Sequence, residues 1–180
     1  AASVGAIDYP SERRINRAPT PRMGGIAIFT GIILVYIIQI IGGFLSWWPQ
    51  ILESSPHLHL NYPLLFLAFA TVFSTGVIDD IHSLSPKKKL AGQLTAAIIA
   101  VCPGLVIGVI DNPFAPGYLQ LGWLAYPITV VYLVAYMNII NLIDGLDGLA
   151  AGISFIASLT MFVLSLWAGR VDAAVLSIAV

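Results

Sequence analysis

The sequence predicts an all-α protein that forms a polytopic bundle of transmembrane helices. Of its 180 residues, 58% are hydrophobic and only 9% are charged, whereas a soluble domain carries about a quarter charged residues. The apolar residues come in blocks that approach the roughly 20 residues a helix needs to cross a bilayer. Backbone polar groups cannot stay unpaired in hydrocarbon, so these blocks are expected to be helices. The net charge of −1 gives no sign of a nucleic-acid partner.

Five apolar blocks are expected to span the membrane, and a sixth starts near residue 173. Their ranges are 23–41, 63–78, 90–110, 123–143, 148–168 and, for the start of the sixth, 173–180. The second block is short, so flanking residues near Asn61 or Asp79 are expected to lengthen it. Because the chain lacks an initial methionine and stops inside an apolar block, we interpret 1–180 as a single, incomplete membrane domain of a longer protein.

The loops between these blocks fall alternately on two sides of the membrane. Seven of the eight basic residues lie on one side, and only Arg170 lies on the other. The positive-inside rule places the basic side in the cytoplasm. The same side receives five aspartates: Asp8, Asp79, Asp80, Asp144 and Asp147. The ionisable side chains therefore gather at one face, which indicates a site.

Two adjacent carboxylates, Asp79 and Asp80, end the second block, and three lysines at 87–89 precede the third. Adjacent acids at a membrane boundary repel each other and lose hydration. A divalent cation, or a phosphate-bound proton for the acids to accept, would explain the pair. Mg²⁺ suits the first explanation, since it prefers one or two carboxylates together with substrate phosphate oxygens. Lys89, nearest the third block, is the better phosphate ligand of the three lysines. The alternative interpretation is a helix cap followed by an ordinary lysine anchor.

A second polar segment, NIINLIDGLDGLAAG, covers residues 138–152. Its polar side chains recur every three residues and form one stripe on a helix: Asn138, Asn141, Asp144 and Asp147. A glycine follows each acid, which permits a break in the helix and the close approach of a ligand. A hydrogen-bonded seam between helices would explain the asparagines and glycines, but it explains the two acids poorly.

A third segment, 8–25, is a basic loop with several prolines that leads into the first block. Its arginines can clamp phosphates or anionic lipid head groups. Anchoring on the cytoplasmic side is the alternative role for them.

Four motifs from these segments together resemble one family of membrane enzymes. They are PTPRMGG at 19–25, GVIDD at 76–80, KLAGQ at 89–93 and NIINLIDGLDGLAAG at 138–152. In order and spacing they resemble the polyprenyl-phosphate N-acetylhexosamine-1-phosphate transferases, glycosyltransferase family 4. KLAGQ and PTPRMGG look closer to the undecaprenyl-phosphate GlcNAc-1-phosphate branch than to phospho-MurNAc-pentapeptide transferase, which stays an alternative.

The resemblance implies a reaction and a cellular place for it. A sugar 1-phosphate would pass from a UDP-sugar to undecaprenyl phosphate, giving a lipid-linked diphospho-sugar and UMP. This is the first membrane step of cell-envelope glycan synthesis, at the cytoplasmic face of the bacterial inner membrane. The implied partners are the UDP-sugar, undecaprenyl phosphate and the bilayer, with a homodimer as a further expectation.

The resemblance also implies residue roles. The catalytic residues would be Asp79, Asp80, Asp144 and Asp147. The substrate-binding residues would be Lys89, Asn138, Asn141, Gly145, Leu146 and Arg22. Mg²⁺, with Mn²⁺ as the alternative, would be held by Asp79, Asp80, Asp144 and a further Asp beyond residue 180. The family has more spans than this chain, including one before Ala1, and a later loop that contains a histidine.

Two other classes of membrane protein share some of these features. CDP-alcohol phosphotransferases also use DG repeats, but they require an arginine shortly after the first DG, and DGLDGLAAGISF at 144–155 contains none. An ion- or proton-coupled transporter would also place acids in the membrane. Transporter sites usually lie near the bilayer midplane and within internal repeats, whereas these acids gather at one interface and no repeat is visible.

Overall fold

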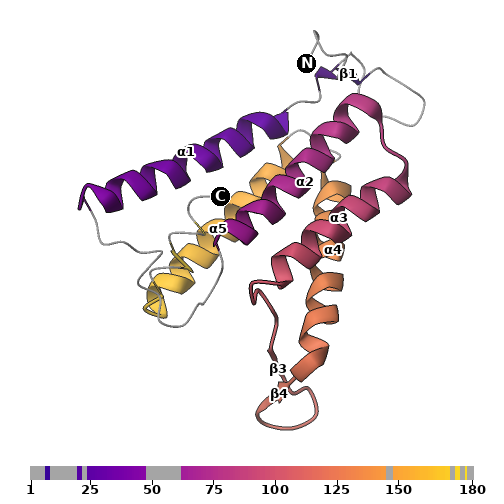
Figure 1. Cartoon of the computed structure of the whole chain (residues 1–180). Helices are drawn as coiled ribbons and strands as arrows, with labels where there is room; N and C mark the ends of the chain where they lie inside the picture. Colours follow the sequence, from indigo (N-terminus) through magenta and orange to yellow (C-terminus); the bar gives the residue numbers. More distant parts are fainter. Residues whose placement is uncertain are drawn as a thin grey trace. The chain divides into compact units, whose positions relative to one another are not determined.

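The computed structural model describes residues 7–8, 20–21, 24–47, 62–144, 148–170, 173–174 and 177. Within these ranges the chain is mostly helical, which confirms the predicted fold class (Figure 1). The chain divides into two compact units. One is His59–Ile140, and the other combines Ala1–Leu58 with Asn141–Val180.

Among the described residues, four helices are long and apolar enough to cross a membrane. They are α1 (Gly24–Phe44), α2 (Tyr62–His82), α4 (Ala125–Ile143), which follows a 3₁₀ turn at Gly122–Leu124, and α5 (Leu149–Trp167). Each of them coincides with one of the predicted spans. Many of their large apolar side chains are exposed, as expected for helices surrounded by lipid rather than water. The chain is therefore a multi-pass membrane protein.

Helix α3 (Pro86–Val101) ends earlier than the predicted span 90–110. Its 16 residues rise about 24 Å, which is less than the roughly 30 Å of the hydrocarbon core. Pro103 cannot continue a helix, and Gly104 adopts the left-handed region with φ 96°. The helix expected over 102–110 is thus replaced by a turn and an extended segment.

Two short antiparallel ribbons accompany the helices. The extended segment after α3 leads into β3 (Val109–Asp111), which pairs with β4 (Tyr118–Gln120). The other ribbon pairs β1 (Ile7–Asp8) with β2 (Thr20–Pro21), within the segment that was expected to be a loop. Both ribbons are small departures from a purely helical fold.

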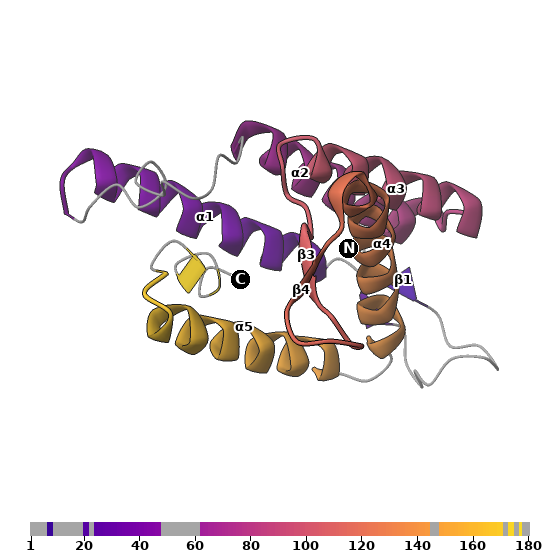
Figure 2. The same ribbon diagram turned by 90° about the horizontal axis from the view of Figure 1, so that it is seen from below.

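Helices α2 and α3 lie side by side and antiparallel, joined by a turn of three residues (Figures 1 and 2). Gly92 permits this close approach. A Cβ at Gly92 would lie 2.5 Å from Thr75 Oγ1 and 2.6 Å from Thr75 Cγ2, so any side chain there would clash. The buried face of α3 is made of Gln93, Ala96, Ala97, Ala100 and Val101. Small residues at such positions are typical of packed membrane helices.

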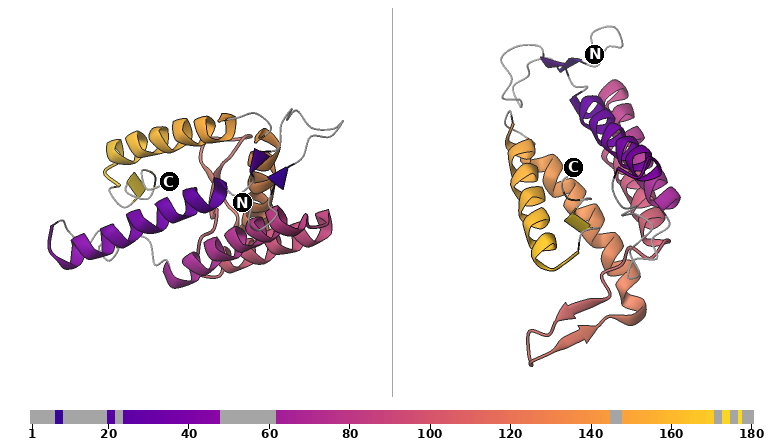
Figure 3. Two further views of the ribbon diagram at one scale, coloured as in Figure 1. Left: turned by 90° about the horizontal axis from the view of Figure 1, so that it is seen from above. Right: turned by 90° about the vertical axis from the view of Figure 1, so that its left-hand side faces the viewer.

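The start of α4 is fixed to the segment that follows α3. The Ile107 N–H donates to Thr129 Oγ1 at 2.8 Å, and the Thr129 hydroxyl donates to the Ala125 carbonyl at 2.6 Å. The β3–β4 ribbon projects beyond this end of α4 (Figure 3, right). In this unit, the ribbon and the α2–α3 turn therefore lie at opposite ends of α3.

Candidate active site

The two adjacent acids, Asp79 and Asp80, lie in the last turn of α2, and both are half-buried. Asp79 closes the turn that follows. Its backbone carbonyl accepts from the Ser83 N–H at 2.8 Å, and its Oδ1 accepts from the Leu84 N–H at 2.9 Å. Ser83 adopts φ 47°, the left-handed conformation in which many helices end. Asp79 thus terminates α2 through its backbone carbonyl and Oδ1, and its other carboxylate oxygen, Oδ2, is not used by the turn.

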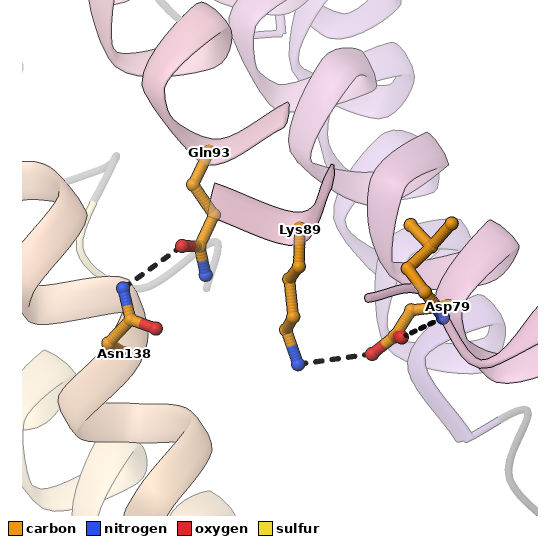
Figure 4. Close-up of polar contacts among 5 residues, drawn as sticks. Asp79, Lys89, Gln93 and Asn138 are labelled. Carbon is orange, nitrogen blue, oxygen red and sulfur yellow. Dashed lines mark hydrogen bonds and ion pairs between the residues drawn. The ribbon is translucent and has the colours of Figure 1, made fainter. Parts of the chain in front are cut away.

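Lys89 lies one turn into α3 and reaches back to the same acid. Helix α3 begins at Pro86, a residue that suits the first position of a helix because its missing N–H needs no partner there. Lys89 Nζ lies 3.1 Å from Asp79 Oδ2, with side chains 28% and 25% exposed respectively (Figure 4). The three-residue turn therefore brings together two predicted site residues that are ten positions apart in sequence.

The Asp79–Lys89 pair has a charge pattern suited to phosphate chemistry at a membrane boundary. An ammonium beside a carboxylate is less costly to hold near hydrocarbon than either charge alone. An ammonium has three donors and each carboxylate oxygen can accept more than one hydrogen bond. The ion pair is therefore compatible with a phosphate oxygen on Lys89 and with a hard cation on the carboxylates.

One turn further along α3, Gln93 connects this helix with α4. Its side chain is buried, with only 6% of the residue exposed. Gln93 Oε1 accepts from Asn138 Nδ2 at 3.0 Å, and the same nitrogen donates to the Val134 carbonyl at 2.8 Å. Asn138, predicted to bind substrate, is thus placed in the same unit as Asp79 and Lys89, with Gln93 between the helices (Figure 4).

The comparison with known families decides the identity of the chain. The model of glycosyl transferase family 4 matches residues 62–180, which include α2, α3, α4 and both acidic segments. The chain belongs to glycosyl transferase family 4. The resemblance seen in the motifs is confirmed by this match.

Curated relatives of this family 4 chain include bacterial transferases of both branches. The probable undecaprenyl-phosphate N-acetylglucosaminyl 1-phosphate transferase of Bacillus subtilis is 37% identical over 95% of the chain and 44% of its own length. The decaprenyl-phosphate N-acetylglucosaminephosphotransferase of Mycobacterium tuberculosis is 34% identical over 92% of the chain and 40% of its own length. A phospho-N-acetylmuramoyl-pentapeptide-transferase of Synechococcus is 36% identical over 78% of the chain and 38% of its own length. The chain therefore spans less than half the length of these relatives. No solved structure matches it.

The second acidic segment of the family 4 chain begins at the end of α4. Asn141 lies on α4, three residues after Asn138, and the exposed Asp144 follows the helix directly. Both belong to the compact unit that combines Ala1–Leu58 with Asn141–Val180. Helix α5 starts after Gly148, whose φ of 77° favours glycine, so the predicted break between two helices is confirmed. A shared pocket for Asp144 and Asp79 stays a prediction.

Several predicted site residues lie outside the described residues: Arg22, Gly145, Leu146 and Asp147. Across the part of the chain that is described, no group of three or more His, Cys, Asp or Glu side chains could hold a metal ion. Asp79 and Asp80 nevertheless offer the all-oxygen donor set that Mg²⁺ prefers, and this metal needs only one or two carboxylates when substrate phosphate supplies further oxygens.

Sequence reasoning did not select Gln93 as a site residue; it served only as a landmark in KLAGQ. The spacing could have indicated Gln93 as a site residue, because an amide four residues after Lys89 lies on the same face of the helix. The contribution of Leu84 left no such signal. It acts through its backbone N–H, which is present whatever side chain stands there.

Proposed function

We propose that the protein containing this chain transfers GlcNAc-1-phosphate from UDP-GlcNAc to undecaprenyl phosphate, releasing UMP. The observation that carries the proposal is the Asp79–Lys89 pair at the end of an apolar membrane helix in a family 4 chain. Two relatives are named as N-acetylglucosaminyl phosphotransferases that use undecaprenyl or decaprenyl phosphate. The reaction would be the first membrane step of cell-envelope glycan synthesis.

In the proposed reaction, an oxygen of the lipid phosphate attacks the phosphorus that bears the sugar. A new P–O–P bond forms to the lipid, and the bond to UMP breaks. Both reactants are anions, so the site must neutralise charge and align oxygens. Lys89 supplies a positive charge for this. The second pKa of a phosphate monoester is about 6, so the attacking group is largely ionised near pH 7, and we assign Asp79 to positioning rather than to a base.

We propose Mg²⁺ as the cofactor, with Mn²⁺ as the alternative. Asp79 and Asp80 would hold it, with Asp144 as a third ligand. When bound, the metal would neutralise charge on the diphosphate. The carboxylates themselves would fix its place at the end of α2, beside Lys89.

The proposed location is the cytoplasmic face of the bacterial inner membrane. A site at the end of membrane helices would let a soluble nucleotide sugar meet a lipid whose tail stays in the bilayer. The basic residues of the loops support this side by the positive-inside rule. A homodimer is part of the same proposal.

The test is release of UMP by the intact protein in membranes supplied with UDP-GlcNAc and Mg²⁺. The proposal expects release only when undecaprenyl phosphate is added, together with a lipid-linked diphospho-sugar. Release that does not depend on the lipid would contradict it. Substrate uptake into sealed vesicles without a lipid product would instead support a transporter.

The second candidate is the phospho-MurNAc-pentapeptide transferase activity of the same family, favoured by the 36% identity to the Synechococcus relative. The same assay with UDP-MurNAc-pentapeptide as donor separates the two. Preference for that donor over UDP-GlcNAc would move the chain to the other branch and leave the phosphoryl-transfer chemistry unchanged.

A further inference from the structure

The orientation of the Gln93 amide is fixed by a chain of hydrogen bonds. The Val134 carbonyl can only accept, so the atom of Asn138 that faces it at 2.8 Å must be the amide nitrogen. That nitrogen also faces Gln93 at 3.0 Å, so Gln93 must present its oxygen. The NH₂ group of Gln93 is therefore directed away from Asn138.

This NH₂ group is a buried donor. The residue is only 6% exposed, and within the described part of the chain no atom accepts a hydrogen bond from it. A buried donor without an acceptor destabilises a protein, so such groups are rare and call for an explanation. An acceptor brought by a ligand would satisfy it.

The surroundings define the chemistry of that acceptor. Gln93 follows Lys89 by one helical turn, and residues four apart have Cβ atoms about 5–6 Å apart on one face. Figure 4 shows both side chains extending from the same side of α3, Lys89 towards Asp79 and Gln93 towards Asn138. An ammonium and an amide NH₂ on one face of a helix suit one anionic group with several acceptor oxygens, which is a phosphate.

We propose that Gln93 is a further substrate-binding residue, which donates its amide N–H to a phosphate oxygen beside Lys89. The inference rests on the proposed function, since that reaction supplies the phosphates. The phosphate belongs either to the polyprenyl acceptor or to the nucleotide-sugar diphosphate. Asn138 then acts as a positioning residue, because its NH₂ group holds the Gln93 amide in the binding orientation.

Two substitutions separate binding from structure. Gln93→Glu keeps the shape and an oxygen that accepts from Asn138, but it replaces the donor with a second acceptor that repels phosphate. Gln93→Met keeps the length, removes the buried donor and carries no charge, so it should fold even if the buried carboxylate does not. Thr95→Val is the matched control, because this exposed hydroxyl on α3 bonds only within its own helix.

The experiment measures UMP release by the intact protein in two series, one varying UDP-GlcNAc at saturating undecaprenyl phosphate and one varying the lipid at saturating UDP-GlcNAc. We expect both Gln93 variants to raise one of the two KM values by about tenfold or more, as for the loss of a hydrogen bond to a charged group. The series in which KM rises identifies whether the lipid phosphate or the diphosphate contacts Gln93. Gln93→Met removes the unpaired donor but also the acceptor of the Asn138 N–H, so its thermal stability should stay close to that of the wild type. Thr95→Val should change neither KM.

Unchanged KM values in both series for Gln93→Met, whatever its kcat, would overturn the inference. So would a KM rise of equal size in Thr95→Val. These results differ from a failure of the proposed function, in which the wild-type protein itself releases no UMP in response to polyprenyl phosphate.

Discussion

Asp79 uses its two carboxylate oxygens for two different purposes. Oδ1 accepts from the Leu84 N–H and so forms part of the turn, whereas Oδ2 pairs with Lys89. The sequence predicted both Asp79 and Lys89 as site residues but assigned them separate ligands. Their pairing depends on the geometry of the short turn, and that geometry depends on Asp79 itself.

The two purposes of Asp79 can be separated by substitution. Asp79→Asn retains an oxygen for the Leu84 N–H and loses only the ion pair, so we expect it to lower the free energy of unfolding by less than about 1 kcal/mol. Asp79→Ala also removes the acceptor and should lower it by about 1 kcal/mol more. Thermal unfolding in detergent measures both. Equal losses in the two variants would show that the Leu84 bond contributes nothing.

The carboxylates assigned to catalysis have a direct test in the transfer reaction. We expect Asp80→Asn and Asp144→Asn to abolish UMP release, since each removes a negative charge assigned to the metal, while membrane insertion stays intact. Asp111→Asn is the control, because this exposed acid lies on β3 at the far end of α3. Near-normal turnover by either catalytic variant would remove that residue from the proposed site.

At the scale of elements, the pairing of α2 with α3 places Asp79 and Lys89 on adjoining helices. The pairing depends on the absence of a side chain at Gly92, which faces Thr75. The sequence showed glycine, alanine and threonine in these helices, but it did not show which glycine is a point of contact. In the sequence Gly76 and Gly92 cannot be told apart. In the structure only Gly92 has neighbouring atoms where a Cβ would lie.

This difference gives a matched pair of variants. Gly92→Ala forces a Cβ to 2.5 Å from Thr75 Oγ1 and should lower the free energy of unfolding by about 1–3 kcal/mol. Gly76→Ala, on α2 with open space around it, should be neutral or stabilising, because alanine favours the helix. Adding Thr75→Ala to Gly92→Ala should restore part of the loss in thermal unfolding experiments. Equal effects at both glycines would contradict the close contact.

The end of α3 shows where apolar patterning stops being informative. Residues 105–107 are as apolar as a span requires, so composition predicted a helix to residue 110. Backbone chemistry decided otherwise, because Pro103 and Gly104 terminate the helix. The other four predicted spans contain no Pro-Gly pair, and each of them holds a long apolar helix.

At the scale of the whole molecule, the β3–β4 loop and the α2–α3 turn are expected to lie on opposite sides of the membrane. In a background with Cys102→Ala, we expect Ala115→Cys, in the loop that joins β3 to β4, to react with a membrane-impermeant maleimide added to intact cells. Ser83→Cys, in the α2–α3 turn, should react only after the membrane is opened, because the positive-inside rule places that turn in the cytoplasm. Reaction of Ser83→Cys in intact cells would reverse the proposed topology.

The Asp79 carboxylate takes part in both the turn and the ion pair. A ligand that alters the ion pair should therefore also alter the backbone hydrogen bond of the turn. When a phosphate draws the Lys89 ammonium towards itself, the charge left on Asp79 becomes less compensated, and the Leu84 N–H is held more strongly at Oδ1. Hydrogen exchange at the Leu84 amide should therefore slow when substrate is bound in the intact protein. A single peptide proton would then report, without any added label, on the arrival of the reactants.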